Sequence, residues 1–118
     1  MNTEENDALF KDEENYAFLD CCQAPALVVK KKIYMSYRDT ETLYQCTTCQ
    51  AYWFYKFYER MSFDEPEDAT VFYAPLSNEE AEAILGSKNR PDLSYLLTRK
   101  CLIKDSQGTR MVGGIPFI

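Results

Sequence analysis

Five cysteines are the residues of this 118-residue chain that offer the clearest chemistry. Cys46 and Cys49 flank two threonines in a Cys-x-x-Cys turn, and the adjacent pair Cys21 and Cys22 lies upstream. Such a turn directs two sulfurs toward one point, and a second pair of ligands completes the tetrahedron that zinc prefers, with zinc–sulfur distances of about 2.3 Å. The sequence therefore predicts a structural zinc site held by Cys21, Cys22, Cys46 and Cys49.

The fourth ligand is the least determined part of this prediction. Adjacent side chains such as Cys21 and Cys22 diverge unless the backbone bends sharply, so Asp20 and Cys101 are alternatives to Cys21. We favour Cys21. A zinc ion with four protein ligands keeps no open position for water or substrate, so a site of this kind supports folding and not catalysis.

Two other roles for the thiols stay open. They could be buried small apolar side chains that hold no metal. Cys46 and Cys49 could also be redox-active, as in a thioredoxin-like site, where the cysteine pair follows a strand and opens a helix. Residues 50–54 favour a strand instead, which argues against the redox role.

The hydrophobic pattern of the sequence predicts the elements that must position these cysteines. It indicates the α+β class, with an antiparallel sheet, zinc-ribbon-like hairpins and one or two short helices packed on the sheet. In the segment 51–60, aromatic side chains alternate between both sides of an extended chain, which is typical of a central strand. Ser77 and Glu80 form a capping box. The expected elements are a helix over 7–19, strands over 26–37 and 42–45 joined by a turn at 38–41, the aromatic strand, a strand over 69–74, a helix from Ser77 to Gly86, a short helix from Pro91, and a hairpin of 100–104 with 109–112.

Length and composition limit the domain organisation. A hydrophobic fraction of 46% in 118 residues is enough for one core. We expect a polar, partly ordered arm over 1–15 and a single α+β domain over 16–118, with the zinc-ribbon-like core at 20–60. The acidic start of the chain and the lack of an apolar run of about 18 residues predict neither a signal peptide nor a membrane anchor. Reduced thiols then favour the cytoplasm.

Charge and residue content restrict the function. The formal net charge of −6 and the sequence pI of about 4.6 oppose attraction to phosphate, which disfavours nucleic acid and favours a partner with a basic protein surface. The chain has no histidine, no glycine-rich phosphate loop and no Gly-x-Ser-x-Gly elbow, which are the usual sequence signs of catalysis. We therefore expect a protein that is not an enzyme.

Three runs of sequence carry a resemblance to a known group of proteins. They are Cys22-x-x-Pro25, LYQCTTCQAYWF at 43–54, and YAPLSNEEA at 73–81. Together they resemble small bacterial immunity proteins with a zinc-ribbon core, over about residues 20–86. The resemblance implies a protein that binds and neutralises a cognate toxin, often a nuclease, inside the producing cell. Ribbons commonly place glycine, which tolerates a positive φ, at the position of Gln50.

The surface that would meet a basic toxin is expected at the acidic residues, because complementary charge speeds association. The candidates are Glu59, Asp64, Glu65, Glu67 and Asp68, with Glu79 and Glu82 as further members. The alternative function is a zinc-ribbon regulator or nucleic-acid accessory protein, in which the run 30–32 of three lysines would contact phosphate. Lysines that protect an edge strand from aggregation explain the same run.

Overall fold

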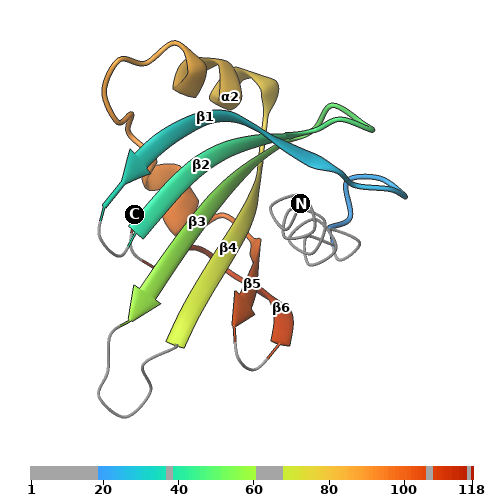
Figure 1. The fold of residues 1–118 in the computed structure, drawn as a ribbon, viewed down its shortest axis with the longest axis vertical. Coiled ribbons are helices and arrows are strands. Elements are labelled where there is room, and N and C mark those ends of the chain that lie inside the picture. Colours follow the sequence, from blue (N-terminus) through green and yellow to red (C-terminus); the bar gives the residue numbers. More distant parts are fainter. Residues whose placement is uncertain (1–18, 37–38, 61–67, 106–107, 117) are drawn as a thin grey trace, which may run out of the picture.

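The computed structural model describes residues 19–36, 39–60, 68–105, 108–116 and 118. In this part of the chain, one antiparallel sheet has its six strands in sequence order, β1-β2-β3-β4-β5-β6 (Figure 1). Helix α2 (Asn78–Leu85) and the 3-10 helix η1 (Ser94–Leu97) connect β4 to β5. The predicted fold class is confirmed. The strands are β1 (Leu27–Met35), β2 (Asp39–Cys46), β3 (Tyr52–Arg60), β4 (Asp68–Leu76), β5 (Cys101–Asp105) and β6 (Gly108–Val112).

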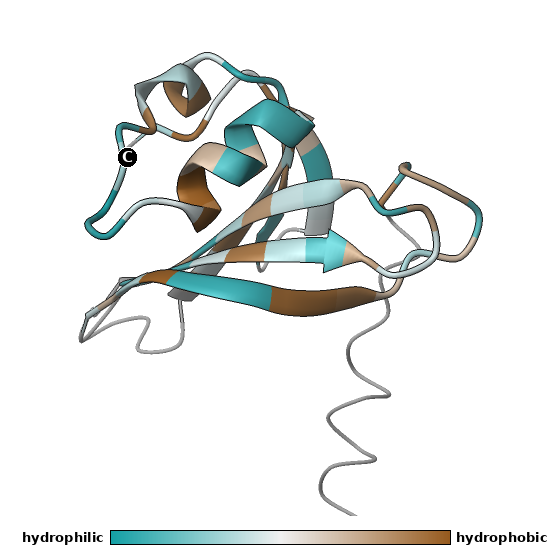
Figure 2. Ribbon diagram, turned by 90° about the horizontal axis from the view of Figure 1, so that it is seen from above, coloured by the Kyte–Doolittle hydropathy of each residue, from teal (hydrophilic) through white to brown (hydrophobic). Residues whose placement is uncertain are grey.

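Strand β3 lies between β2 and β4 and carries the core on both faces of the sheet. Phe54 is fully buried beside Leu43 in the cluster that α2 covers, on the face where Figure 2 shows the helix. Trp53 packs with Leu19 and Tyr73 in a second cluster. Since neighbouring residues of a strand point to opposite faces, the prediction of a two-sided aromatic strand is confirmed.

Helix α2 begins as its sequence predicts. The amide of Glu80 donates to the Ser77 hydroxyl at 3.1 Å, and the Ser77 amide donates to the Glu80 carboxylate at 2.9 Å. Gly86 is the C-cap, and Ala81 and Ile84 are the buried residues of the helix. The short helix expected from Pro91 is instead the single 3-10 turn η1. Among the described residues, no helix is long and apolar enough to cross a membrane.

The turn predicted at 38–41 is wrong for residues 39–41, and residue 38 lies outside the described residues. Strand β2 already begins at Asp39, and Glu41 pairs with Lys56 across the sheet. Charged residues signalled a turn, but a carboxylate can lie in a strand where a cation neutralises it. The hairpin of β5 and β6 agrees with its prediction. The arm at 1–15 and nearly all of the helix expected at 7–19 lie outside the described residues.

Candidate metal centre

The register of the first hairpin brings the two cysteine pairs together. Leu27, at the start of β1, lies opposite Cys46, the last residue of β2. Cys21 and Cys22 precede β1, and Cys49 lies in the turn between β2 and β3. Their four sulfurs all lie within 4.8 Å of one another. The structure thus gathers all four predicted ligands into one group that could hold a metal ion.

The adjacent cysteines converge because the chain bends from Cys21 to Ala24. The Sγ atom of Cys22 lies 3.9 Å from that of Cys21 and 3.7 Å from that of Cys46. Four sulfurs at about 2.3 Å from one central zinc ion stand roughly 3.8 Å apart, so these separations fit a tetrahedral site. All five cysteines are free thiols.

The two alternative ligands do not join the group. Cys101 is fully buried in the core cluster beneath α2. Its apolar surroundings raise the pKa of its thiol to about 11, as expected for a thiol that acts as a small apolar side chain. Asp20 is exposed and lies outside the four-residue group. Of the ligands weighed from the sequence, Cys21 is therefore the one that the geometry selects.

The two threonines inside the Cys-x-x-Cys turn hold it against the upstream segment. The hydroxyl of Thr48 donates to the Ala24 carbonyl at 2.6 Å, and the amide of Thr47 donates to the Ala26 carbonyl at 2.8 Å. Gln50 leaves the turn with a φ of 71°, the conformation that ribbons commonly assign to glycine. Sequence reasoning missed the role of the threonines, because their acceptors become neighbours only once β1 and β2 pair.

The four thiols differ in how readily they ionise. Burial opposes ionisation of Cys46, but hydrogen bonds from the backbone of Ala26, Cys49 and Thr48 outweigh it and lower the pKa to about 6. Burial raises the pKa of Cys21 to about 12 and also raises that of Cys22, with neighbouring thiols adding to both shifts. Several thiolates this close repel one another, and a divalent cation is what would offset that repulsion.

Trp53 adds an independent observation beside the thiols. Its side chain is 3% exposed, and its indole Nε1 is buried with no hydrogen-bond partner among the described residues. The indole N–H nevertheless acts on Cys21, lowering the pKa of that thiol against the effect of burial. Cys21 packs against the cluster that contains Trp53, and a buried N–H donor beside a thiol is the kind of group that the outer shell of a metal site supplies. The sequence predicts Trp53 only as one of the aromatic residues of the central strand.

The described members of the predicted acidic surface lie outside the cysteine group. Glu59 is partly buried near the far end of β3, roughly 20 Å along the strand from the metal centre. Asp68 opens β4 with its backbone opposite Arg60. Glu79 and Glu82 are exposed on α2. The other three candidates, Asp64, Glu65 and Glu67, lie outside the described residues.

The lysine run on β1 is only partly free to meet a partner. The Lys31 ammonium donates to the carbonyls of Ile84 at 2.6 Å and Ser87 at 2.5 Å. These carbonyls are at the C-terminal end of α2, where a cation is favourable to the helix dipole. Lys31 therefore has a structural role, and Lys30 and Lys32 are the exposed members of the run.

No protein-family model matches this chain, and no curated protein or solved structure matches it. Any functional argument therefore rests on the side chains themselves. The strongest are the four convergent thiols, in a chain of formal net charge −6.

Proposed function

We propose that Cys21, Cys22, Cys46 and Cys49 hold a structural zinc ion, and that the chain is a non-enzymatic protein-binding module of the immunity-protein type. It binds and neutralises a cognate bacterial toxin in the cytoplasm. The observation that carries the proposal is the convergence of four thiols within 4.8 Å. Four protein ligands would leave zinc no position for substrate, so the ion would stiffen a docking scaffold.

The charge of the chain supports a basic protein as the partner. A formal net charge of −6 attracts a positive surface and repels phosphate. We assign the toxin contact to the acidic segment that follows β3, with Glu59 and Asp68 at its strand ends. Of this surface, Glu59 lies far along β3 from the metal centre, which suits a zinc ion that acts only on stability.

The alternative, a regulator or nucleic-acid accessory protein, has weaker support. It relied on three lysines in β1, and one of them, Lys31, caps helix α2. The thiol-oxidoreductase alternative expects a helix to open at the second cysteine, whereas the strand β3 follows Cys49.

A co-expression experiment tests the proposal. The toxin domain encoded beside the gene for this chain is expressed in a bacterial host, with and without the chain, and host survival is measured. We expect survival only when both are present, together with a complex that co-elutes in size-exclusion chromatography. Neither rescue nor a complex would contradict the immunity function.

Charge reversal tests the surface. Lysines introduced together at Asp64, Glu65, Glu67 and Asp68 should slow association with the toxin by about tenfold or more at low salt, because complementary charge mainly raises the association rate. Stopped-flow kinetics measures this rate. The matched comparison uses two double variants with the same change in charge. One carries Glu65→Lys and Glu67→Lys, and the other carries Glu79→Lys and Glu82→Lys on α2. Equal slowing by both pairs would mean that the segment after β3 is not the specific contact.

A further inference from the structure

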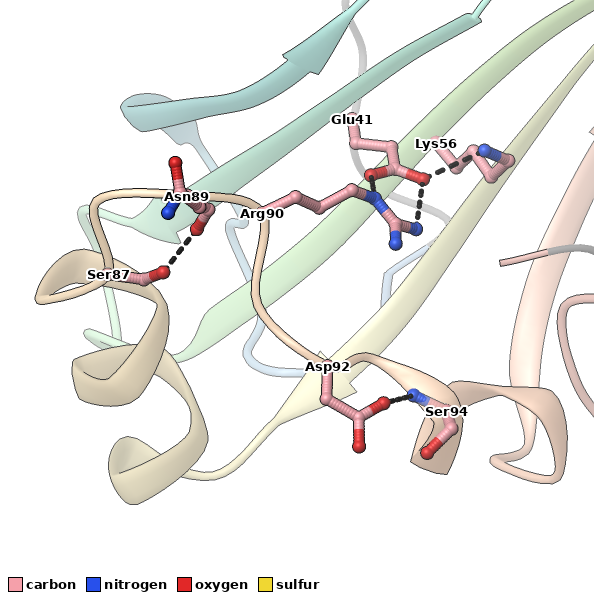
Figure 3. Close-up of polar contacts among 7 residues, drawn as sticks. All are labelled: Glu41, Lys56, Ser87, Asn89, Arg90, Asp92 and Ser94. Carbon is pink, nitrogen blue, oxygen red and sulfur yellow. Dashed lines mark hydrogen bonds and ion pairs between the residues drawn. The ribbon is translucent and has the colours of Figure 1, made fainter.

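An open pocket lies on the helix-covered face of the sheet, at the end remote from the cysteines. Its volume is about 370 Å³, within the range of small-molecule sites. Asp39 and Glu41 reach it from the same face of β2. Arg90 reaches it from the loop after α2, where Figure 3 shows its side chain beside Glu41 and Lys56. The lining residues are Tyr34, Asp39, Glu41, Lys56, Arg90 and Ile118.

The floor of the pocket is a built network of buried charges. The Glu41 carboxylate accepts from Lys56 Nζ at 2.9 Å and from Arg90 Nε at 2.8 Å and Nη2 at 2.9 Å. The Glu41 and Lys56 side chains are 2% and 5% exposed. Such a network is rigid, since moving one member would leave another charge buried without its partner.

Two polar groups of the pocket are left without a protein partner. Asp39 Oδ1 is buried and has no hydrogen bond among the described residues. Arg90 uses Nε and Nη2 on Glu41, while its third nitrogen, Nη1, has no hydrogen bond to the described residues. The first group requires a donor and the second an acceptor. Among the described lining residues, the four charged side chains, two acidic and two basic, sum to zero.

We propose that this pocket binds a small zwitterion of the free α-amino acid class. The ligand ammonium group donates to Asp39, and its carboxylate accepts from Arg90. A zwitterion leaves the pocket neutral and meets both unused groups, whereas a simple cation or anion would meet one and face a like charge at the other. Tyr34, 42% exposed, and Ile118 supply an apolar wall for the ligand side chain. The site is independent of the toxin-binding function.

The test is a titration of the full chain with each proteinogenic L-α-amino acid, followed by NMR and calorimetry. We expect saturable binding of at least one, with shifts at Asp39, Arg90 and Tyr34. Its N-acetyl and its amide derivatives should each bind about tenfold weaker or worse, because each removes one charged hydrogen bond. No binding by any amino acid, or derivatives that both bind as tightly as the free amino acid, would overturn the proposal.

Asp39→Asn separates ligand binding from structure. We expect it to weaken binding about tenfold or more while the stability of the free protein stays equal or rises, because Asp39 Oδ1 accepts no hydrogen bond from the described residues. Glu79→Gln, an exposed acid on α2, is the matched control and should bind as the parent does. Unchanged affinity in Asp39→Asn would also overturn the assignment.

Discussion

Cys46→Ser should abolish stoichiometric zinc binding and remove about 4 kcal/mol or more of the free energy of unfolding measured in excess zinc. A metal that binds only the folded chain stabilises it by about 4 kcal/mol at a thousand times its dissociation constant. Cys46 is fully buried, and the backbone around it lowers the pKa of its thiol to about 6, so a neutral serine hydroxyl would replace the most readily ionised ligand. Metal analysis of protein purified under reducing conditions measures the zinc content. Denaturant unfolding measures the free energy of unfolding.

Cys101→Ser is the matched control for this prediction. It makes the same chemical change at an equally buried thiol that lies in the core beneath α2, outside the metal centre. It should keep full zinc content and lose only the stability expected from burying a hydroxyl, about 1–3 kcal/mol. If Cys46→Ser retains the zinc of the parent protein, or if a strong chelator leaves the stability of the parent unchanged, the structural zinc site is wrong.

The cysteine group could be predicted from the sequence because its information is local. The spacing of Cys46 and Cys49 fixes a turn, and two further thiols upstream supply the remaining ligands. What the sequence left open was whether Cys21 could turn toward the others. That depends on the bend from Cys21 to Ala24 and on the hydrogen bonds that Thr47 and Thr48 make to it, which arise only when β1 and β2 pair.

The charged pocket could not be predicted in the same way, because its members are far apart in the chain. Glu41 was assigned to a turn on composition, and Arg90 was assigned no role. One signal was present: Lys56 interrupts an otherwise aromatic strand at a position whose neighbours, Phe54 and Tyr58, point to the same face. A lysine on a core face requires a buried anion, although the sequence does not say which one.

Glu41→Gln should destabilise the protein by about 3–5 kcal/mol, the range for breaking a buried ion pair by removing one partner. The substitution leaves the Lys56 ammonium, in a side chain that is 5% exposed, without its anion. Burial alone would raise the pKa of Glu41, but the hydrogen bonds and charges of Arg90 and Lys56 lower it below the ordinary 4.5. The stabilisation from the ionised Glu41 carboxylate is therefore complete above pH 4.5, the ordinary pKa of the group, and is lost as the pH falls through its lower pKa in the folded state. Denaturant unfolding across this range should show the difference between parent and variant shrinking in acid.

Two further variants distinguish a buried charge network from ordinary surface pairing. Glu80→Gln makes the same change in the Glu80–Arg99 pair, whose side chains are 23% and 28% exposed, and glutamine retains the capping-box bond. It should lose only about 1 kcal/mol. The double variant Glu41→Leu with Lys56→Leu should recover most of the stability lost in Glu41→Gln. It removes both buried charges of the pair, and Arg90, which is 35% exposed, stays hydrated. A double variant as unstable as Glu41→Gln would mean that packing, and not the loss of the carboxylate beside the Lys56 ammonium, accounts for the loss.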